Sequence, residues 1–533
     1  MADFYYQRGD VPCALNDEKF KVIYQNETVV TTGLNLFYNE HTITQVLEGD
    51  HSVTVLGYVY KQNGDIQSYL AELLRNFTDD RIAEVKKELL GQYLVIMSHE
   101  DNIYLFSDFL QTRTIFYDTD RKMASSSFAA LGATCTDEYK AFEYLAMRHC
   151  IYPSWLGNTT IDKRIRKVRS YEYLKINKAT GEMESPKLQF AIDNSKIASF
   201  KEAKSYTLSL LRNVIRHPDY QNKVIGSTIT GGFDSRLVTS LVNEYYSNVT
   251  LRVATLKGEN SLDYKIATQV VKTMGLPLKV YETDLDTQKD AFYDLTDGLT
   301  PRENGLMMQF LQHVGEYDLG FGGAFGTELY TSIDFDAVDQ LVTDFSNKAR
   351  AAVKADDPYY KAFEKALRDE FENINTCFVL KEQNIKDTMR IFRLMITGFF
   401  SSQVMAAYNI YGRQFEMFGT FPVIEAGLRI PYEYMGSRTT FGRFYMVPKA
   451  LVEQLNPKVS KIDTTHFCPM RPLSVGSFAS YVLGKFKQKS YYKNMAKAQA
   501  GKNITLSYDS DRIKYTSNYW FEGFKQKYLT PKQ

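Results

Sequence analysis

The residues best suited to chemistry lie in one short stretch, Thr230–Arg236, which reads TGGFDSR. Two adjacent glycines let a backbone turn approach a ligand without a Cβ clash. Asp234 can ligate a divalent cation, and the hydroxyl groups of Thr230 and Ser235 can donate to oxygen atoms. Because Asp234 would repel a bare phosphate, the stretch predicts a phosphate site at which Mg²⁺ enters together with the anion.

The sequence on either side of this stretch predicts the elements that position it. Val224, Ile225 and Ile229 favour a buried strand before it. After it, apolar residues recur at the spacing of one helix face. They are Leu237, Val238, Leu241, Val242 and Tyr245. The N-terminus of such a helix offers backbone N–H groups and a positive dipole end to a bound anion.

The same strand and helix pattern repeats directly downstream. Residues 249–256 predict a second strand, residues 261–274 an amphipathic helix ended by Gly275, and residues 278–281 a third strand. Two successive strand–helix–strand units predict a parallel sheet with right-handed crossovers, whose ligands bind at the carboxyl ends of the strands. Thr255 and Leu256 would then lie where a nucleotide base binds. A further helix, with its apolar stripe at Ala203, Tyr206, Leu210, Leu211, Val214 and Ile215, is expected before the first strand.

The first 195 residues have a different, strand-rich pattern. Residues 52–60 alternate with a period of two, and residues 92–97 and 102–106 predict a hairpin. Residues 66–74 and 141–147 have helical spacing. The polar segment between about 180 and 200 is the best boundary, so we predict one domain over 1–195 and a second over 196–533.

Composition excludes some functions for the chain as a whole. Its 533 residues include 64 Lys and Arg against 63 Asp and Glu, and the net charge of +1 provides no global field for nucleic acid or an anionic membrane. Five scattered cysteines favour reduced thiols in a cytoplasmic setting. The start of the chain lacks the apolar core of a signal peptide, and the apolar run 394–408 is interrupted by polar residues, which favours a buried helix. We therefore expect neither membrane nor nucleic-acid partners.

The order of residues in TGGFDSR resembles the Ser-Gly-Gly-x-Asp-Ser pyrophosphate loop of ATP pyrophosphatases, with Thr230 keeping the hydroxyl of the first serine. These enzymes split ATP between its α and β phosphates. Two later segments resemble asparagine synthetases. Ser261–Ala267 fits Ser-x-Asp-x-x-x-Ala, where Asp263 is either a site residue or a solvent-facing acid in the first helical turn. Leu319–Tyr330 resembles Leu-Ser-Gly-Glu-Gly-Ala-Asp-Glu-Leu-Phe.

The resemblance assigns roles within Leu319–Tyr330. Gly322 and Gly323 fall on the residues that approach ATP, and Glu328 falls on the second acid of the pair that helps to hold magnesium. Thr327 replaces the first acid of that pair. The segment 415–431 resembles the part of the family that follows its catalytic glutamate, and residues 423–431 align without a gap. The family's glutamate falls on Arg413, and a three-residue slip would place Glu416 there instead.

The N-terminal domain resembles the glutaminase-type domain of asparagine synthetases through Gly91–Tyr93, Ser107–Tyr117 and Ala124–Leu131. That domain uses an N-terminal cysteine whose own α-amino group is the general base. Here position 2 is Ala2, Cys13 is followed by a sequence unlike the family's start, and the Arg-Gly-Pro-Asp and Asn-Gly-Glu motifs are absent from the sequence. We therefore expect a retained but inactive glutaminase fold.

Together the resemblances imply an α/β and α+β chain. It would have an N-terminal Ntn-hydrolase-like sandwich and a C-terminal parallel-sheet ATP-pyrophosphatase domain, of the adenine nucleotide α-hydrolase-like kind, with a helical C-terminal part. They imply a carbon–nitrogen ligase of the type used in asparagine biosynthesis. Such an enzyme adenylates a carboxylate, releases pyrophosphate and passes the acyl group to an amine, and its cofactors would be ATP and Mg²⁺. The partners would be a small-molecule or peptide carboxylate and an amine, with a homodimer left open.

We assign residues to this chemistry as follows. Nucleotide binding is expected from Ile229, Thr230, Gly231, Gly232, Asp234, Ser235, Thr255, Leu256, Gly322 and Gly323. The metal is expected on Asp234 and Glu328, and Ser235 and Glu416 are the candidate catalytic residues.

Three alternatives stay open at this level. The first is a synthetase that uses an amine other than glutamine-derived ammonia, as β-lactam synthetases and lasso-peptide cyclases do when they close a ring, or one that modifies a sugar acid or peptide. The second is an adenylating nucleotide or RNA modifier. The third is a degenerate ATP-binding scaffold.

Overall fold

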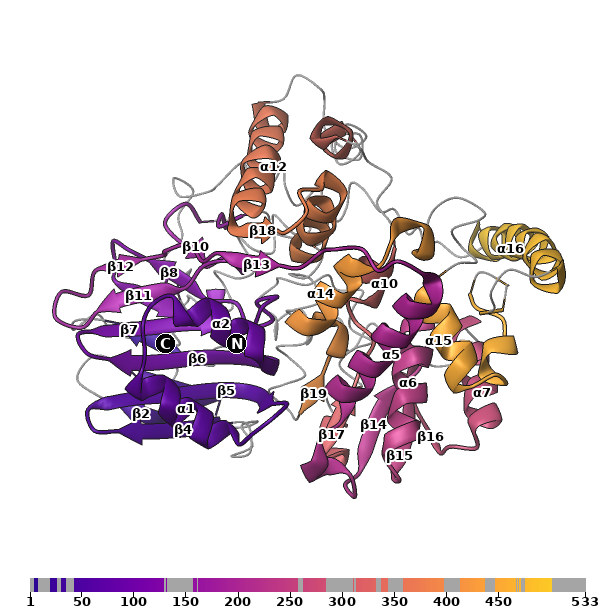
Figure 1. Ribbon diagram of the computed structural model, residues 1–533, viewed down its shortest axis with the longest axis horizontal. Helices are drawn as coiled ribbons and strands as arrows, with labels where there is room; N and C mark the ends of the chain where they lie inside the picture. Colours follow the sequence, from indigo (N-terminus) through magenta and orange to yellow (C-terminus); the bar gives the residue numbers. More distant parts are fainter. Residues whose placement is uncertain are drawn as a thin grey trace.

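The computed structural model divides the protein into two parts with different sheets (Figure 1). It describes residues 4–7, 20–25, 30–34, 43–128, 131, 157–160, 162–256, 262–283, 310, 313–331, 337–343, 358–396, 413–436, 446–465, 467, 469–470 and 475–500. Residues 4–187 contain two antiparallel sheets, which we call the antiparallel region, and residues 200–470 contain a parallel sheet, which we call the parallel region. The fold is therefore mixed, with both α/β and antiparallel components.

Two six-stranded sheets form the antiparallel region. The first has the order β10-β8-β9-β1-β3-β2 and the second β12-β11-β7-β6-β5-β4. The strands of the first sheet are β1 (Tyr5–Gln7), β2 (Phe20–Gln25), β3 (Val30–Leu34), β8 (Phe116–Asp118), β9 (Met123–Ser125) and β10 (Arg166–Lys167). Those of the second are β4 (Ile43–Glu48), β5 (His51–Lys61), β6 (Leu89–His99), β7 (Asn102–Ser107), β11 (Leu174–Asn177) and β12 (Met183–Glu184).

Alternation along β6 explains how the second sheet is buried on both faces. Leu94 and Ile96 pack with residues of the first sheet, so the two sheets share a core. Val95 and Met97 point the other way, into a core that includes helices α1 (Ile66–Arg75) and α2 (Arg81–Glu88). The predicted strand 52–60, the hairpin of 92–97 with 102–106 and the helix 66–74 are confirmed by β5, β6, β7 and α1. The predicted helix 141–147 lies outside the described residues.

The parallel region is built on a five-stranded sheet with the order β16-β15-β14-β17-β19, in which every paired strand is parallel. Its strands are β14 (Ile225–Thr228), β15 (Val249–Leu256), β16 (Leu278–Thr283), β17 (Leu319–Phe321) and β19 (Gln414–Phe415). This confirms the parallel sheet predicted from the two strand–helix–strand units, and β15 has the predicted bounds.

Helices surround this sheet (Figure 1). They are α5 (Phe200–Ile215), α6 (Phe233–Tyr245), α7 (Leu262–Met274), α10 (Gly326–Tyr330), α14 (Phe421–Arg429) and α15 (Val447–Leu455), with α12 (Pro358–Cys377) and α16 (Val475–Ala500) farther out. Gly275 ends α7 with a φ of 70°, as expected for a C-terminal cap. One detail of the predicted α5 stripe is wrong, because Tyr206 is 37% exposed whereas Thr207 and Leu208 are buried. The Tyr206 ring instead lies 5.1 Å from the Arg429 guanidinium.

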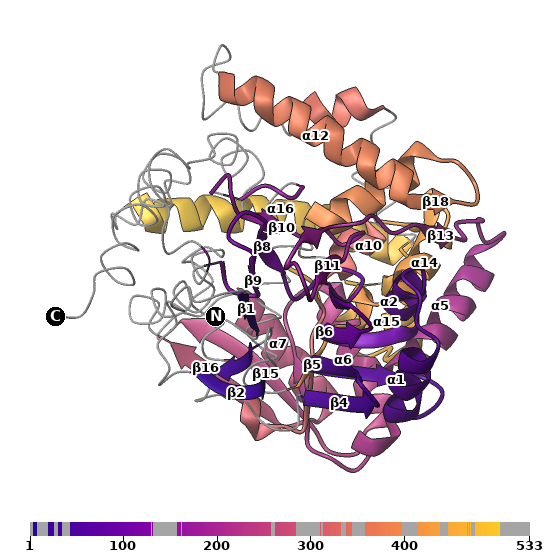
Figure 2. The ribbon, with the colours of Figure 1, turned by 90° about the vertical axis from the view of Figure 1, so that its left-hand side faces the viewer.

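A two-stranded parallel pair connects the two regions near the predicted boundary. Strand β13 (Phe190–Ile192) pairs with β18 (Phe378–Leu380), which directly follows α12. Figure 2 shows α12 along one edge of the molecule, next to this pair. The domain boundary at residue 195 stays a prediction.

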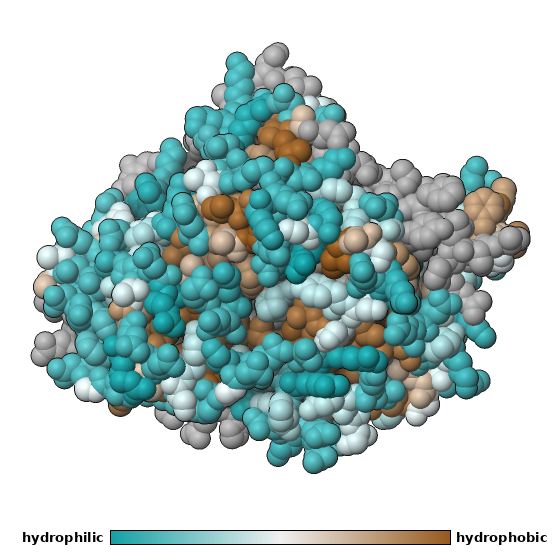
Figure 3. Space-filling model, viewed as in Figure 1, coloured by the Kyte–Doolittle hydropathy of each residue, from teal (hydrophilic) through white to brown (hydrophobic). Residues whose placement is uncertain are grey.

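Polar side chains cover most of the face shown in Figure 3, where apolar side chains form separate patches. Phe478, Leu483 and Phe486 of α16 are among the exposed large apolar residues. Within the described residues, no helix has both the length and the apolar character needed to cross a bilayer.

The pairing of β5 with β6 depends on a glycine that no other residue can replace. Gly91 has a φ of 125°, and an added Cβ would lie 2.0 Å from the Tyr58 carbonyl oxygen. We expect Gly91→Ala to cost more than the roughly 1–3 kcal/mol of backbone strain alone and to lower the melting temperature. Thermal unfolding followed by circular dichroism measures the change.

Gly49 supplies the matched control. Its φ is 60°, but an added Cβ would have no atom within 4 Å. Gly49→Ala should therefore show only the strain of a left-handed residue, roughly 1–2 kcal/mol. Equal losses in the two variants would contradict the steric argument.

Candidate functional site

The TGGFDSR stretch forms the loop after β14 and the first turn of α6. The Thr230 backbone N–H donates to Ser235 Oγ at 3.0 Å, and the two hydroxyl oxygens lie 2.9 Å apart. The Gly231 N–H donates to Asp263 Oδ1 at 2.8 Å. Through this contact Asp263 fixes the loop. Because the Gly231 N–H is already occupied, the donors for an anion must come from the residues next to Gly231.

Helix α6 begins where a ligand could use its free end. Gly232 is the N-cap, and no described side chain caps the helix. Arg236 is fully buried and fastens the first turn of α6 to a distant segment, because it donates to the carbonyl oxygens of Ile462 at 2.8 Å and Asp463 at 2.6 Å. An added Cβ on Gly231 would lie 2.7 Å from Thr465 Cγ2, whereas one on Gly232 would meet nothing nearer than 3.6 Å. The loop is thus packed tightly on one side and open at the helix N-terminus.

The third motif packs directly on this loop. An added Cβ on Gly323 would lie 2.9 Å from the Ser235 backbone nitrogen, and one on Gly326 would lie 2.3 Å from Asp234 Oδ1. The Thr327 hydroxyl donates to Asp234 Oδ2 at 2.8 Å. Thr327 therefore contacts the acid of the first motif, across 93 residues of sequence. Phe325 has a φ of 71°, which turns the chain from β17 into α10.

Asp234 has an incomplete set of partners. The residue as a whole is partly exposed, but its Oδ1 atom is buried and has no hydrogen-bond partner among the described residues. Burial raises the pKa of Asp234 to about 8, the charge of Glu328 acts in the same direction, and the Thr327 hydrogen bond opposes them. A nearby cation would reverse this shift.

These residues fit a magnesium ion that arrives with a nucleotide. Oδ1 of Asp234 is the orphaned atom, and Glu328 lies close enough to influence its pKa. The described residues contain no cluster of three or more potential metal ligands. Mg²⁺ in nucleotide sites usually takes one or two carboxylates, with phosphate oxygens and water completing the octahedron.

Glu416 lies on the opposite side of the same glycine-rich turn. It is 1% exposed, its Oε2 accepts from the Ala324 N–H at 2.9 Å, and its Oε1 accepts from Gln414 Nε2 at 2.9 Å. An added Cβ on Gly322 would lie 2.0 Å from Oε1, so only glycine allows this approach. Burial raises the pKa of Glu416 to about 7, although Gln414, Ala324 and the charge of Arg252 lower it.

Arg252 is a site residue that the sequence reasoning missed. It is 1% exposed in the middle of β15, and its Nη2 lies 3.3 Å from Gln414 Oε1. Its guanidinium also stacks 4.4 Å from the Tyr317 ring. Gly226 and Gly320 leave room for it, because an added Cβ on either would lie 3.0 Å from its nitrogens. The available signal was a lone charge in an otherwise uncharged strand.

The other predicted nucleotide residues lie along the same edge of the sheet. The Ile229 N–H donates to the Arg252 carbonyl at 2.9 Å, which fixes the start of the loop. Thr255 is buried near the end of β15, Leu256 is the last residue of that strand, and Glu328 is in the first turn of α10. Arg413 bonds to the Tyr220 hydroxyl, so the acid beside the glycine-rich turn is Glu416.

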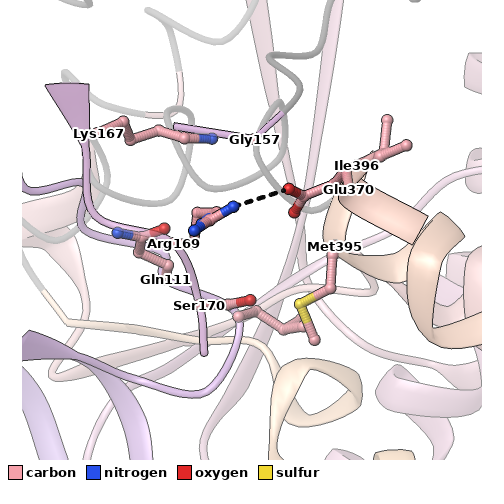
Figure 4. Close-up of a pocket in the computed structure, with 9 residues that line it drawn as sticks. Gln111, Gly157, Lys167, Arg169, Ser170, Glu370, Met395 and Ile396 are labelled. Carbon is pink, nitrogen blue, oxygen red and sulfur yellow. Dashed lines mark hydrogen bonds and ion pairs between the residues drawn. The ribbon is translucent and has the colours of Figure 1, made fainter. Parts of the chain in front are cut away.

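A separate pocket lies where the two regions meet (Figure 4). It is lined by Leu110, Gln111, Gly157, Lys167, Arg169, Ser170, Glu370, Met395 and Ile396. Arg169 pairs with Glu370 across the junction at 3.4 Å, and burial lowers the pKa of Lys167 to about 8. None of the residues predicted for the site lines this pocket.

No protein-family model matches the chain, and no curated protein sequence matches it. Among solved structures, it is similar to NMN synthetase from Francisella tularensis, with 13% identity and a TM-score of 0.20 over 55% of this chain and 94% of that one. It is also similar to the glutamine phosphoribosylpyrophosphate amidotransferase from B. subtilis complexed with ADP and GMP, with 11% identity and a TM-score of 0.18 over 45% of this chain and 48% of that one. The chain thus spans about half of the amidotransferase.

Ionisation of the Asp234 carboxyl should lower the free energy of unfolding as the pH rises, because the pKa of this group is raised from 3.8 to about 8 in the folded protein. A raised carboxyl pKa leaves stability intact below the unfolded pKa and reduces it as the pH approaches the folded pKa. We expect Asp234→Asn to melt above the wild type at pH 8 and close to it near pH 4. Thermal unfolding across this pH range measures the difference.

Asp65 provides a control of opposite sign. It caps α1, and hydrogen bonds from the Ser68 backbone and hydroxyl lower its pKa. Its stabilisation is therefore present above the unfolded pKa and lost as the pH falls. Asp65→Asn should melt below the wild type at pH 8, and a rise there like that of Asp234→Asn would contradict the assignment.

Proposed function

We propose that this chain is an ATP-dependent amide-forming ligase of the asparagine-synthetase type. It would adenylate a carboxylate, release pyrophosphate and transfer the acyl group to an amine. The observation that carries the proposal is the contact of Thr327 and Gly326 with Asp234. It brings two distant motifs of one resemblance together at the carboxyl end of a parallel sheet, where ligands of such sheets bind.

The first chemical step needs groups that stabilise the leaving pyrophosphate. A substrate carboxylate oxygen attacks the α phosphorus of ATP, and the bond from this phosphorus to the bridging oxygen of the β phosphate breaks. The N-terminus of α6 with the hydroxyls of Thr230 and Ser235 would hold the pyrophosphate, and Asp234 and Glu328 would hold its magnesium ion. The ion supplies neutralisation of the charge that develops on the leaving group.

The second step needs a base near the acyl carbon. The amine attacks this carbon, AMP leaves with the bonding electrons, and the amine nitrogen loses a proton. Glu416 would accept that proton, since a base with a pKa near 7 is matched to neutral pH. Arg252 and Gln414 would hold its carboxylate in place.

The fold supports a finer assignment of the two regions. The sandwich of antiparallel sheets would be the Ntn-hydrolase-like domain. Ser107–Tyr117 resembles the family's Arg-Asp-x-x-Gly-x-x-Pro-Leu-Tyr-Tyr, and Gln111, at the position of its glycine, has a φ of 54°. The parallel region would be the ATP-pyrophosphatase domain. Because the sequence lacks the Arg-Gly-Pro-Asp and Asn-Gly-Glu motifs with which the family holds glutamine, we propose an acceptor amine other than glutamine-derived ammonia, either free or within the substrate.

Magnesium-dependent turnover of ATP tests the proposal directly. We expect AMP and pyrophosphate, not ADP and phosphate, from a panel of carboxylic acids offered with ammonia, glutamine or an internal amine. Asp234→Ala should lower pyrophosphate release at least about a hundredfold, since charge stabilisation of a leaving group supplies several kcal/mol.

Asp101 supplies a matched acidic control, because it lies in the turn between β6 and β7, away from the site. Asp101→Ala should retain full turnover. Formation of ADP would contradict the proposal. Tight binding of ATP without pyrophosphate release for any acceptor would favour the degenerate scaffold, in which Thr327 has replaced the first acid of the pair that helps to hold magnesium.

The second step should depend on pH through Glu416. With an acceptor amine that stays unprotonated throughout, the rate of amide formation should rise with pH and level off above about 7, as the carboxyl loses its proton. Glu416→Gln should lower the rate by about 10²–10⁴ and remove this dependence. Rates measured from about pH 5.5 to 9 check the profile, and a midpoint that persists in Glu416→Gln would assign it to another group.

A further inference from the structure

The backbone of Glu416 is held by a side chain from the antiparallel region. Gln92 lies on β6 and is 1% exposed. Its Oε1 accepts from the Glu416 N–H at 3.2 Å, and its Nε2 donates to the Glu416 carbonyl at 3.4 Å. The amide group of Gln92 thus pairs with Glu416 as a neighbouring peptide group would.

This pairing matters because of where Glu416 lies in the sheet. Strand β19 contains only Gln414 and Phe415, and it is the edge strand of the parallel sheet, paired with β17 alone. A short edge strand has unpaired backbone groups on its outer side. Gln92 satisfies those of the next residue, Glu416, from the other region of the molecule.

Aromatic residues of the antiparallel region hold the residue before Glu416. The Phe415 ring packs 6.1 Å from Tyr58 and 5.6 Å from Tyr60, and it lies 5.0 Å from His217 of the parallel region. Tyr58 hydrogen-bonds to His217 Nδ1, and the Tyr60 hydroxyl donates to the Val214 carbonyl. These contacts fasten β5 to the end of α5 as well as to β19.

The residues after Glu416 are held in the same way. An added Cβ on Gly419 would lie 3.3 Å from Leu110 Cδ1, and Phe421 packs edge-to-face on Phe109 at 5.0 Å. The antiparallel region therefore contacts the chain before, at and after the candidate base.

We propose that the antiparallel region forms a structural half of the amide-forming site, with Gln92 as the positioning residue for Glu416. This rests on the proposed function. The Glu416 carboxylate accepts one hydrogen bond from the turn after β17 and one from Gln414, both at 2.9 Å. A displacement of about 1 Å at a reacting group can cost about a hundredfold in rate. The region thereby has a role that requires no glutamine hydrolysis.

Two variants separate positioning from general stabilisation of the junction. Gln92→Leu removes both hydrogen bonds to Glu416. Tyr60→Phe removes the hydrogen bond to Val214 across the same junction but keeps the ring on Phe415. Gln92→Asn, whose amide is one methylene shorter, replaces Gln92→Leu if that variant fails to fold.

Hydrogen exchange followed by mass spectrometry tests the contact without any assay of activity. We expect a peptide covering residues 413–421 to exchange at least about tenfold faster in Gln92→Leu than in the wild type, and at the wild-type rate in Tyr60→Phe. Unchanged exchange in Gln92→Leu, or equal acceleration in both variants, would overturn the positioning role.

Kinetics of the two half-reactions complete the test. We expect Gln92→Leu to lower amide formation about a hundredfold while ATP–pyrophosphate exchange stays within about twofold of the wild type. An equal fall in both half-reactions would overturn the proposal. Absence of ATP–pyrophosphate exchange in the wild type would instead contradict the proposed function, and the hydrogen-exchange result would still decide the role of Gln92.

Discussion

The site depends on one steric constraint, the direct packing of the glycine-rich turn after β17 between two carboxyl groups. Gly326 lies against Asp234 on one side, and Gly322 lies against Glu416 on the other. Any side chain at either glycine would push these acids apart. The parallel register that places β17 between β14 and β19 delivers both acids to the same edge of the sheet. The turn, the sheet order and the two acids therefore form one unit.

The two acids have different surroundings, which suits different tasks. Glu416 is almost fully enclosed and accepts two hydrogen bonds, so its charge is partly supported by the protein. Asp234 keeps one buried oxygen without a partner among the described residues. A group of the first kind can exchange a proton, whereas one of the second kind is suited to binding a cation. Groups with raised pKa values often mark functional sites for this reason.

Local patterns predicted the parallel region well. The bounds of strand β15 and the end of α7 at Gly275 follow from the propensities and spacing of residues close together in the sequence. Partners brought together by the fold could not be predicted in this way. Arg252 gave only a weak signal, and nothing in the neighbourhood of Gln92 indicates a contact 324 residues away. The resemblance left Asp263 open between a site residue and a solvent-facing acid, and its contact with the Gly231 N–H is seen only in the structure.

The contact between the two regions at His217, Tyr58 and Tyr60 determines the pH range in which the site keeps its structure. Burial lowers the pKa of His217 to about 3, and burial raises those of Tyr58 and Tyr60. Because the pKa of His217 is lowered in the folded protein, a pH below its ordinary value of 6.5 favours separation of the two regions. Between that value and strongly alkaline pH, these three groups keep one protonation state. Near neutrality, protons taken up or released by Glu416 thus leave this junction unchanged, whereas stronger acid weakens the contact between the regions.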